Sequence, residues 1–209
     1  MRFFDEIWEC LNSCDLEQKF SKFSQIYSNF HSCDMNFSSD IFKLSAPSYS
    51  KICSIKSMKE IKQKHTNEAF LHSIAHIEYS AIDIALDACY RFRNLPMEYY
   101  LDWLEVANDE IRHFKMISDK MESLGVRYGD YIVHDGLFIA LIKTQNSLIN
   151  RMAILPRYME ANGPEQAHKN AVELAEHTKA WKGHEVLIAT HIDKGHIHTH
   201  FIVNSVNYE

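Results

Sequence analysis

The sequence predicts a mainly α-helical protein, an antiparallel helical bundle followed by a short helix and a β-hairpin. Up to about residue 163, apolar residues recur at helical spacing. The 209 residues include only 6 glycines and 4 prolines, both below average usage, which disfavours disorder and barrel-rich all-β folds. From 186 to 206, two short apolar runs flank a polar turn, as in a hairpin. We therefore divide the chain into residues 1–66, 67–163 and 164–209.

The first segment is predicted to contain two helices and an irregular connection. Apolar residues at helical spacing cover 3–11 and 16–31. Asp15 is placed as the N-cap of the second helix, with Gln18 at the capping-box position. Residues 34–66 are rich in serine and lack helical periodicity, so we expect them to wrap over the bundle.

Three longer helices are predicted for the bundle itself. The first covers about 67–92, and the second covers about 96–124 and is stopped by Gly125. The third begins near residue 134 and continues to about 162, with a kink or break at Pro156 because proline interrupts helical hydrogen bonding.

Carboxylates fall on the apolar faces of these helices. Glu78 lies at the centre of one stripe, Glu110 lies within the next with His113 one turn on, and Glu160 falls near the apolar side of the third helix. The two clearest stripes consist of Ile74, Ala75, Ala81, Ile82 and Ala85, and of Trp103, Val106, Ala107, Phe114 and Ile117. A buried carboxylate is costly unless it is paired or bound to a metal.

This pattern fits a ferritin-like di-metal bundle. Such bundles take one Glu from each of two helices and a Glu-x-x-His pair from each of the other two. Glu78 and Glu160 would be the single glutamates, and Glu110 with His113 would be one pair, since i, i+3 spacing puts both side chains on one helix face. The predicted metal ligands are therefore Glu78, Glu110, His113 and Glu160, binding iron or manganese.

The alternative for each glutamate is an ion pair with a nearby arginine. The candidate partners are Arg91, Arg112, Arg151 and Arg157. His72 and His76 lie one turn apart; they could support the metal ligands, although we favour a hydrogen-bonded structural role.

Four stretches of the helical part carry a family resemblance: AHIEYSAIDIALDACYRF, DWLEVANDEIRHFKM, YGDYIVHDGLF and ILPRYMEANG. They resemble a ferritin-like bacterial family of uncharacterised function, the one numbered 455 among domains of unknown function. The resemblance covers most of residues 1–163. That family is similar in fold to the di-iron tRNA hydroxylases, which implies iron and oxygen chemistry.

In that family a further helix carries the second Glu-x-x-His, and this sequence departs from the pattern there. Glu165 and His168 have the right spacing, but they follow Glu160 too closely for an antiparallel return. We therefore expect an incomplete bundle that lacks the fourth ligand helix and holds a single ion. Its unpaired groove would favour a homo-oligomer.

The C-terminal segment is rich in histidine. In the predicted strands 185–190 and 197–204, His198 and His200 are two residues apart and so share a face of the sheet, and His191 ends the first strand. Three converging imidazoles predict a site for a divalent metal such as Mg, Mn or Zn.

The segment THIDKGHIHTHFIVNSVN resembles the metal motif of plasmid mobilisation relaxases, H-x-D followed by H-x-H-x-x-x-N. The resemblance implies that His191, His198 and His200 hold an ion that polarises a phosphate of single-stranded DNA. That family's catalytic tyrosine precedes the matched segment, so no nucleophile carries over and nicking is not expected. Residues 164–209 contain four lysines against six acids, which offers DNA binding little support.

Composition constrains the cellular setting. No apolar run reaches about 18 residues, the N-terminus is acidic, and the net charge is −6. Five cysteines without a C-x-x-C pair predict reduced, mostly buried thiols. We expect a soluble, cytoplasmic protein with no membrane association.

Three functional hypotheses follow. The first is a ferritin-like metal-binding protein, ancestrally a di-iron oxidoreductase or oxygenase, impaired because half of the di-metal site is absent. The second is a relaxase-like, metal-binding DNA-processing fragment without its tyrosine. The third is a truncated or chimeric helical protein without activity, since a gene fusion, an assembly error or a designed chimera would each produce a junction near residue 163.

Overall fold

The computed structural model describes residues 1–37, 40–57, 59–61, 66–153, 172 and 182, together with the backbone of 184–193 and 196–207. Two compact units, Met1–Gln145 and Asn146–Glu209, make up the chain. The described residues are mainly helical, which confirms the predicted class. No helix among them is long and apolar enough to cross a bilayer.

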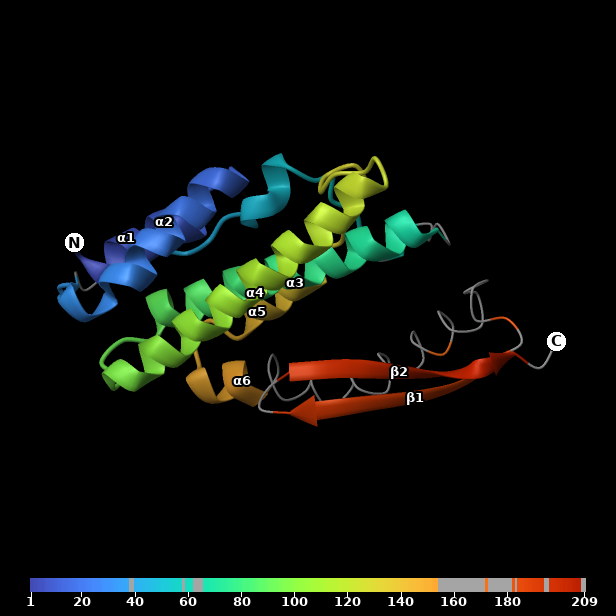
Figure 1. Ribbon diagram of the computed structural model, residues 1–209. Coiled ribbons are helices and arrows are strands. Elements are labelled where there is room, and N and C mark those ends of the chain that lie inside the picture. The colour runs from blue at the N-terminus through green and yellow to red at the C-terminus, as the bar shows by residue number, and fades with distance from the viewer. Residues whose placement is uncertain are drawn as a thin grey trace. The chain divides into compact units, whose positions relative to one another are not determined.

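Two long helices form the centre of the first unit. α3 (Asn67–Arg91) and α4 (Met97–Ser123) run antiparallel and pack along each other (Figure 1). α1 (Phe3–Leu11) packs on α3, and α2 (Leu16–Asn29) packs on α1. α5 (Gly136–Lys143) also packs on α3.

The predicted helix boundaries are confirmed to within one or two residues for α1 to α4, because local capping chemistry sets them. The Asp15 carboxylate accepts a hydrogen bond from the Gln18 amide at 2.9 Å, as expected of the N-cap of α2. Thr66 caps α3 in the same way through the Ala69 amide. α4 begins directly after Pro96, and its C-terminal turn leads to Gly125, whose φ of 77° suits glycine.

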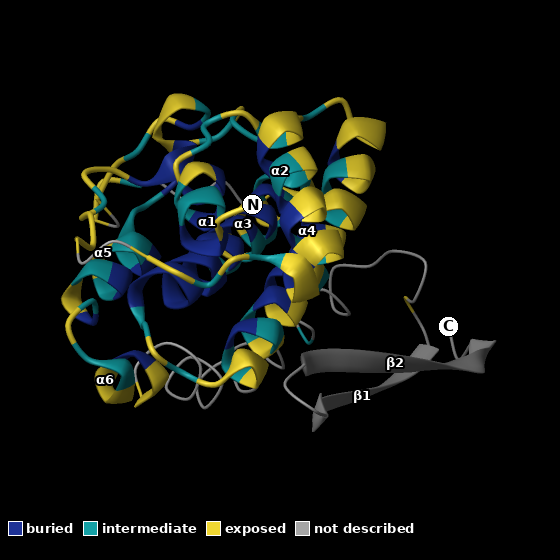
Figure 2. Cartoon of the chain, turned by 90° about the vertical axis from the view of Figure 1, so that its left-hand side faces the viewer, coloured by how far each residue is buried: buried dark blue, intermediate teal, exposed yellow. Residues whose placement is uncertain are grey.

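The core of the first unit lies where α1, α3 and α4 face one another (Figure 2). Its fully buried side chains include Phe3, Ile7, Ile26, Tyr79, Ile82, Leu104 and Phe114. Val106 is an exception to the predicted stripe of α4, because its side chain is 41% exposed. It lies about 100° around the helix from the buried Ala107 and therefore faces away from the main α3–α4 contact.

Buried charges tie the irregular segment 40–57 to the helices. Lys19 of α2 pairs with Asp83 of α3 at 2.6 Å, and the Ser48 hydroxyl donates to the same carboxylate at 2.7 Å. Ser48 begins the short 3-10 helix η2 (Ser48–Lys51). This pairing keeps a buried ammonium and a buried carboxylate compensated.

The predicted third helix, 134–162, is wrong as a single element. α5 ends at Lys143, and α6 (Leu148–Met152) begins only after a break and belongs to the second unit. The Thr144 hydroxyl donates to the Ala140 carbonyl at 2.9 Å, which occupies a helix-terminal acceptor. Ser147 then caps α6 through the Asn150 amide. The break thus precedes Pro156, which lies outside the described residues.

The second unit contains a pair of strands whose backbone is described. β1 (His184–Asp193) and β2 (His196–Asn207) form a two-stranded antiparallel sheet (Figure 1). Its register places His191 opposite His198, and Ala189 opposite His200.

Candidate metal centre

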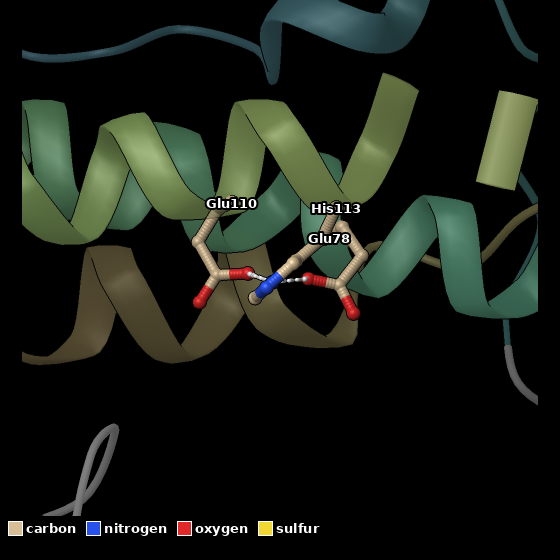
Figure 3. A group of neighbouring side chains, drawn as sticks. All are labelled: Glu78, Glu110 and His113. Atoms are coloured by element: carbon tan, nitrogen blue, oxygen red, sulfur yellow. Dashed lines mark hydrogen bonds and ion pairs between the residues drawn. The ribbon is translucent and has the colours of Figure 1, made fainter. Parts of the chain in front are cut away.

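Three of the predicted ligands come together on α3 and α4. Glu78, Glu110 and His113, here called the α3–α4 cluster, offer one ligand atom each, and these atoms lie within 4.8 Å of one another. The imidazole lies between the two carboxylates (Figure 3). Its Nδ1 is 3.3 Å from Glu110 Oε2 and 3.5 Å from Glu78 Oε2.

Helix geometry and ring packing produce this arrangement. Glu110 and His113 are three residues apart on α4, so both project from the same side of the helix. The Tyr79 and Phe114 rings meet edge to face at 5.7 Å, and each directly follows a member of the cluster. This buried contact fixes the axial position of α3 relative to α4 and therefore sets Glu78 opposite Glu110.

Burial and mutual repulsion oppose the simultaneous ionisation of Glu78 and Glu110. Their side chains are about one fifth exposed, at 20% for Glu78 and 21% for Glu110. Burial, and then the hydrogen bond and negative charge of Glu110, raise the pKa of Glu78 to about 9. At neutral pH the Glu78 carboxyl therefore keeps a proton when no cation is bound.

The alternative of an arginine partner receives no support from the described ranges. Arg91 forms its ion pair with Asp87 at 2.6 Å, and Arg112 pairs with Asp109 at 3.2 Å. Within those ranges, no lysine or arginine forms an ion pair with either cluster glutamate. Arg151 belongs to the second unit.

Several predicted site residues remain untested. Glu160 lies outside the described residues, as do Glu165, His168 and Arg157. His191, His198 and His200 lie in β1 and β2, but their side chains are not described. The hairpin metal site therefore stays a prediction.

His72 and His76 have the hydrogen-bonded structural role that we favoured. His76 Nε2 donates to the His134 carbonyl at 2.8 Å, and its Nδ1 accepts from the Tyr128 hydroxyl at 3.0 Å. His72 Nε2 accepts from the Gly129 amide at 2.9 Å. Burial lowers the pKa of His76 to about 4, so the ring stays neutral. The two rings fasten the segment between α4 and α5 onto α3.

The donor set of the cluster suits a transition metal. Carboxylate oxygens with an imidazole nitrogen are ligands that iron and manganese accept. A bound divalent ion would also replace the proton on Glu78 and neutralise the charge of the two carboxylates. The residues present therefore fit such an ion, and the three ligands that the described part of the chain supplies would leave further coordination positions for other groups.

Comparison with known proteins gives one match over most of the chain and two over parts of it. The model of the family described as "Protein of unknown function (DUF455)" matches residues 12–199, beyond the expected limit near residue 163. An uncharacterized protein of Haemophilus influenzae is 42% identical over 102 residues, 46% of this chain and 35% of that protein. Protein rlx of Staphylococcus aureus is 46% identical over 46 residues, 22% of this chain and 14% of that protein. The chain thus spans less than two fifths of the length of either relative. No solved structure matches significantly.

Proposed function

We propose that this chain, which belongs to the DUF455 family, is a ferritin-like protein that binds iron or manganese through Glu78, Glu110 and His113. One observation carries the proposal. Two half-buried carboxylates and an imidazole meet on two packed helices, and among the described residues neither carboxylate has a lysine or arginine partner.

The chain's own residues would hold and orient the ion. Glu110 and His113 offer adjacent ligands from one face of α4, while Glu78 approaches from α3. The proton on Glu78 must leave before the carboxylate can bind an ion, so binding strengthens as pH rises toward the Glu78 pKa of about 9.

We propose a di-iron oxidoreductase or oxygenase as the ancestral activity. Iron with open coordination positions supplies redox and oxygen chemistry when it is bound. On this proposal, the described helices would provide three of the six ligands of a ferritin-like di-metal site. A chain with these three ligands and the predicted Glu160, but without a second Glu-x-x-His pair, would bind an ion and would be impaired as an oxidase.

An anaerobic calorimetric titration of the metal-free protein with Fe²⁺ or Mn²⁺ tests the metal site. We expect wild-type protein to bind about one ion per chain, and Glu110→Gln and His113→Gln to bind at least tenfold more weakly. Glu105→Gln is the matched control, because Glu105 is exposed on α4 outside the cluster. Equal binding by all four proteins would refute the assignment.

A second candidate function rests on the partial match to Protein rlx. Here His191, His198 and His200 of the strand pair would bind Mg²⁺, Mn²⁺ or Zn²⁺ and, through it, a phosphate of single-stranded DNA. Binding of a single-stranded oligonucleotide should then require the metal and disappear in the His198→Ala/His200→Ala variant. If neither candidate passes its test, the helical protein without activity is the remaining interpretation.

A further inference from the structure

We propose that Tyr128 is a positioning residue for the metal centre, whose ring fixes how the ligand on α3 stands against the two ligands on α4. This inference rests on the proposed function, because it concerns the same α3–α4 cluster. It adds a residue from the segment between α4 and α5, which acts on the ligands through Tyr79 and Phe114.

Three aromatic rings from three parts of the chain meet where α3 packs on α4. Tyr79 belongs to α3, Phe114 belongs to α4, and Tyr128 lies in the segment that follows α4. The Tyr128 ring stacks on Tyr79 with 5.4 Å between centroids, and it meets Phe114 edge to face at 5.1 Å. Both partner rings are buried. Because packed interiors transmit displacements, a shift of the Tyr128 ring is passed to both helices.

Each of the two helix rings adjoins a ligand. Glu78 directly precedes Tyr79, and His113 directly precedes Phe114. A rotation or translation of either helix that follows its ring therefore also moves a ligand. The distances from a metal ion to its ligands tolerate deviations of only about 0.2 Å. The separation of α3 and α4 at these rings therefore decides how well the three ligands reach one ion.

The Tyr128 ring is itself held by two histidines of α3. The Tyr128 hydroxyl donates to His76 Nδ1 at 3.0 Å, and burial raises the pKa of this hydroxyl, so it keeps the proton that it donates. The His72 ring stacks on Tyr128 at 5.2 Å, while His72 Nε2 accepts from the Gly129 amide at 2.9 Å. These contacts fix the ring relative to α3, as a residue that positions metal ligands requires.

Electron paramagnetic resonance of bound Mn²⁺ and a calorimetric Mn²⁺ titration test this role. Tyr128→Leu removes the ring, so we expect Mn²⁺ affinity to fall by about tenfold or more. We also expect the zero-field splitting of the bound ion to change, because it reports the ligand geometry. Tyr128→Phe keeps the ring and should restore both properties. A ring that only stabilised the fold would leave the spectrum of the folded, loaded protein unchanged.

Tyr131→Leu is the matched control. Tyr131 lies in the same segment and packs on His72 at 5.3 Å, outside the group of three rings. We expect this variant to lose stability in urea unfolding but to bind Mn²⁺ with wild-type affinity and spectrum. Equal effects of Tyr131→Leu and Tyr128→Leu on the ion would overturn the proposal.

Failure of the inference is distinguishable from failure of the proposed function. Mn²⁺ binding with wild-type affinity and spectrum in Tyr128→Leu overturns the positioning role and leaves the proposed function standing. If wild-type protein binds no Mn²⁺, both fail together.

Hydrogen exchange tests the same coupling without any substitution. If the closed segment strengthens Mn²⁺ binding about tenfold, bound Mn²⁺ must slow the opening of that segment by the same factor. The Gly129 amide, which is bonded to His72, should then exchange about tenfold more slowly in Mn²⁺ than in EDTA. The Gln18 amide in the cap of α2 should not change. Unchanged exchange at Gly129, or equal slowing at Gln18, would refute the coupling.

Discussion

Replacing Glu110 with glutamine should stabilise the metal-free protein and weaken its stabilisation by metal. The ligand atoms of Glu78 and Glu110 lie within 4.8 Å of each other. Two unit charges at that separation repel by about 3.5 kcal/mol at an effective dielectric constant of about 20. The protein avoids this repulsion by keeping Glu78 protonated, which at pH 7 costs about 3 kcal/mol for a pKa moved from 4.5 to about 9.

Only part of that cost disappears in Glu110→Gln, because burial is the largest cause of the raised Glu78 pKa. We therefore expect the free energy of unfolding in EDTA to rise by about 1 to 2 kcal/mol, or the Tm to rise by roughly 3–6 °C for a chain of this size. Wild-type protein should instead gain about 2.7 kcal/mol from Mn²⁺ at one hundred times its Kd, and the variant, which binds at least tenfold more weakly, should gain about 1.4 kcal/mol or less.

Thermal and urea unfolding at pH 7, each in EDTA and in Mn²⁺, measure both effects. Glu105→Gln should behave as wild type in both buffers, since its side chain is exposed. A Glu110→Gln protein that is no more stable than wild type in EDTA would contradict the charge repulsion, and one that Mn²⁺ stabilises as much as wild type would contradict the metal ligand.

Three further predictions concern the scaffold around the cluster. The pKa of His76 is lowered from 6.5 to about 4, so between these values the unfolded chain binds more protons than the folded chain. The free energy of unfolding should therefore fall as the pH drops through that range, by up to about 3 kcal/mol. Urea unfolding should show this pH dependence, and a His76→Gln variant with the same dependence would contradict it. Lys19→Met should lower the free energy of unfolding by about 3–5 kcal/mol because it leaves the Asp83 carboxylate buried without its ammonium partner. The double variant Lys19→Met/Asp83→Leu should recover most of that loss. A small effect of Lys19→Met in urea unfolding would show that the ion pair is not needed. Gly129→Ala should lower the free energy of unfolding by at least about 2 kcal/mol, since φ is 110° and a Cβ would lie 2.8 Å from the Ile52 carbonyl oxygen. A change below about 0.5 kcal/mol would contradict the close approach of the two backbones.

The sequence predicted those features that depend on short-range physics. Asp15 is a local cap, and helical periodicity alone places Glu110 and His113 on one face. The proximity of Glu78 to that pair was also predictable, because two amphipathic helices that each direct a carboxylate inward must meet along those faces.

Features that depend on long-range contacts were not predictable. The helix breaks after Lys143, where the Thr144 hydroxyl donates a hydrogen bond to the Ala140 carbonyl of its own helix. Threonine also occurs inside helices without ending them, so the residue type alone does not predict the break. The exposure of Val106 depends on where α3 contacts α4, which periodicity fixes only to within a neighbouring position. The segment at Tyr128 and Gly129 is held by histidines more than 50 residues away in the sequence. The pair Tyr128 and Gly129 is the one local signal in the sequence that is consistent with this packing.

The iron and manganese content per chain, measured on protein purified after growth with both metals, tests whether the α3–α4 cluster is the metal site. Three proteins are compared: wild type, Glu78→Gln/Glu110→Gln and His198→Ala/His200→Ala. We expect about one ion per chain in wild type and in the histidine variant, and almost none in the glutamine variant. Metal that survives loss of the two glutamates but disappears with the two histidines would contradict this expectation and would assign metal binding to the strand pair.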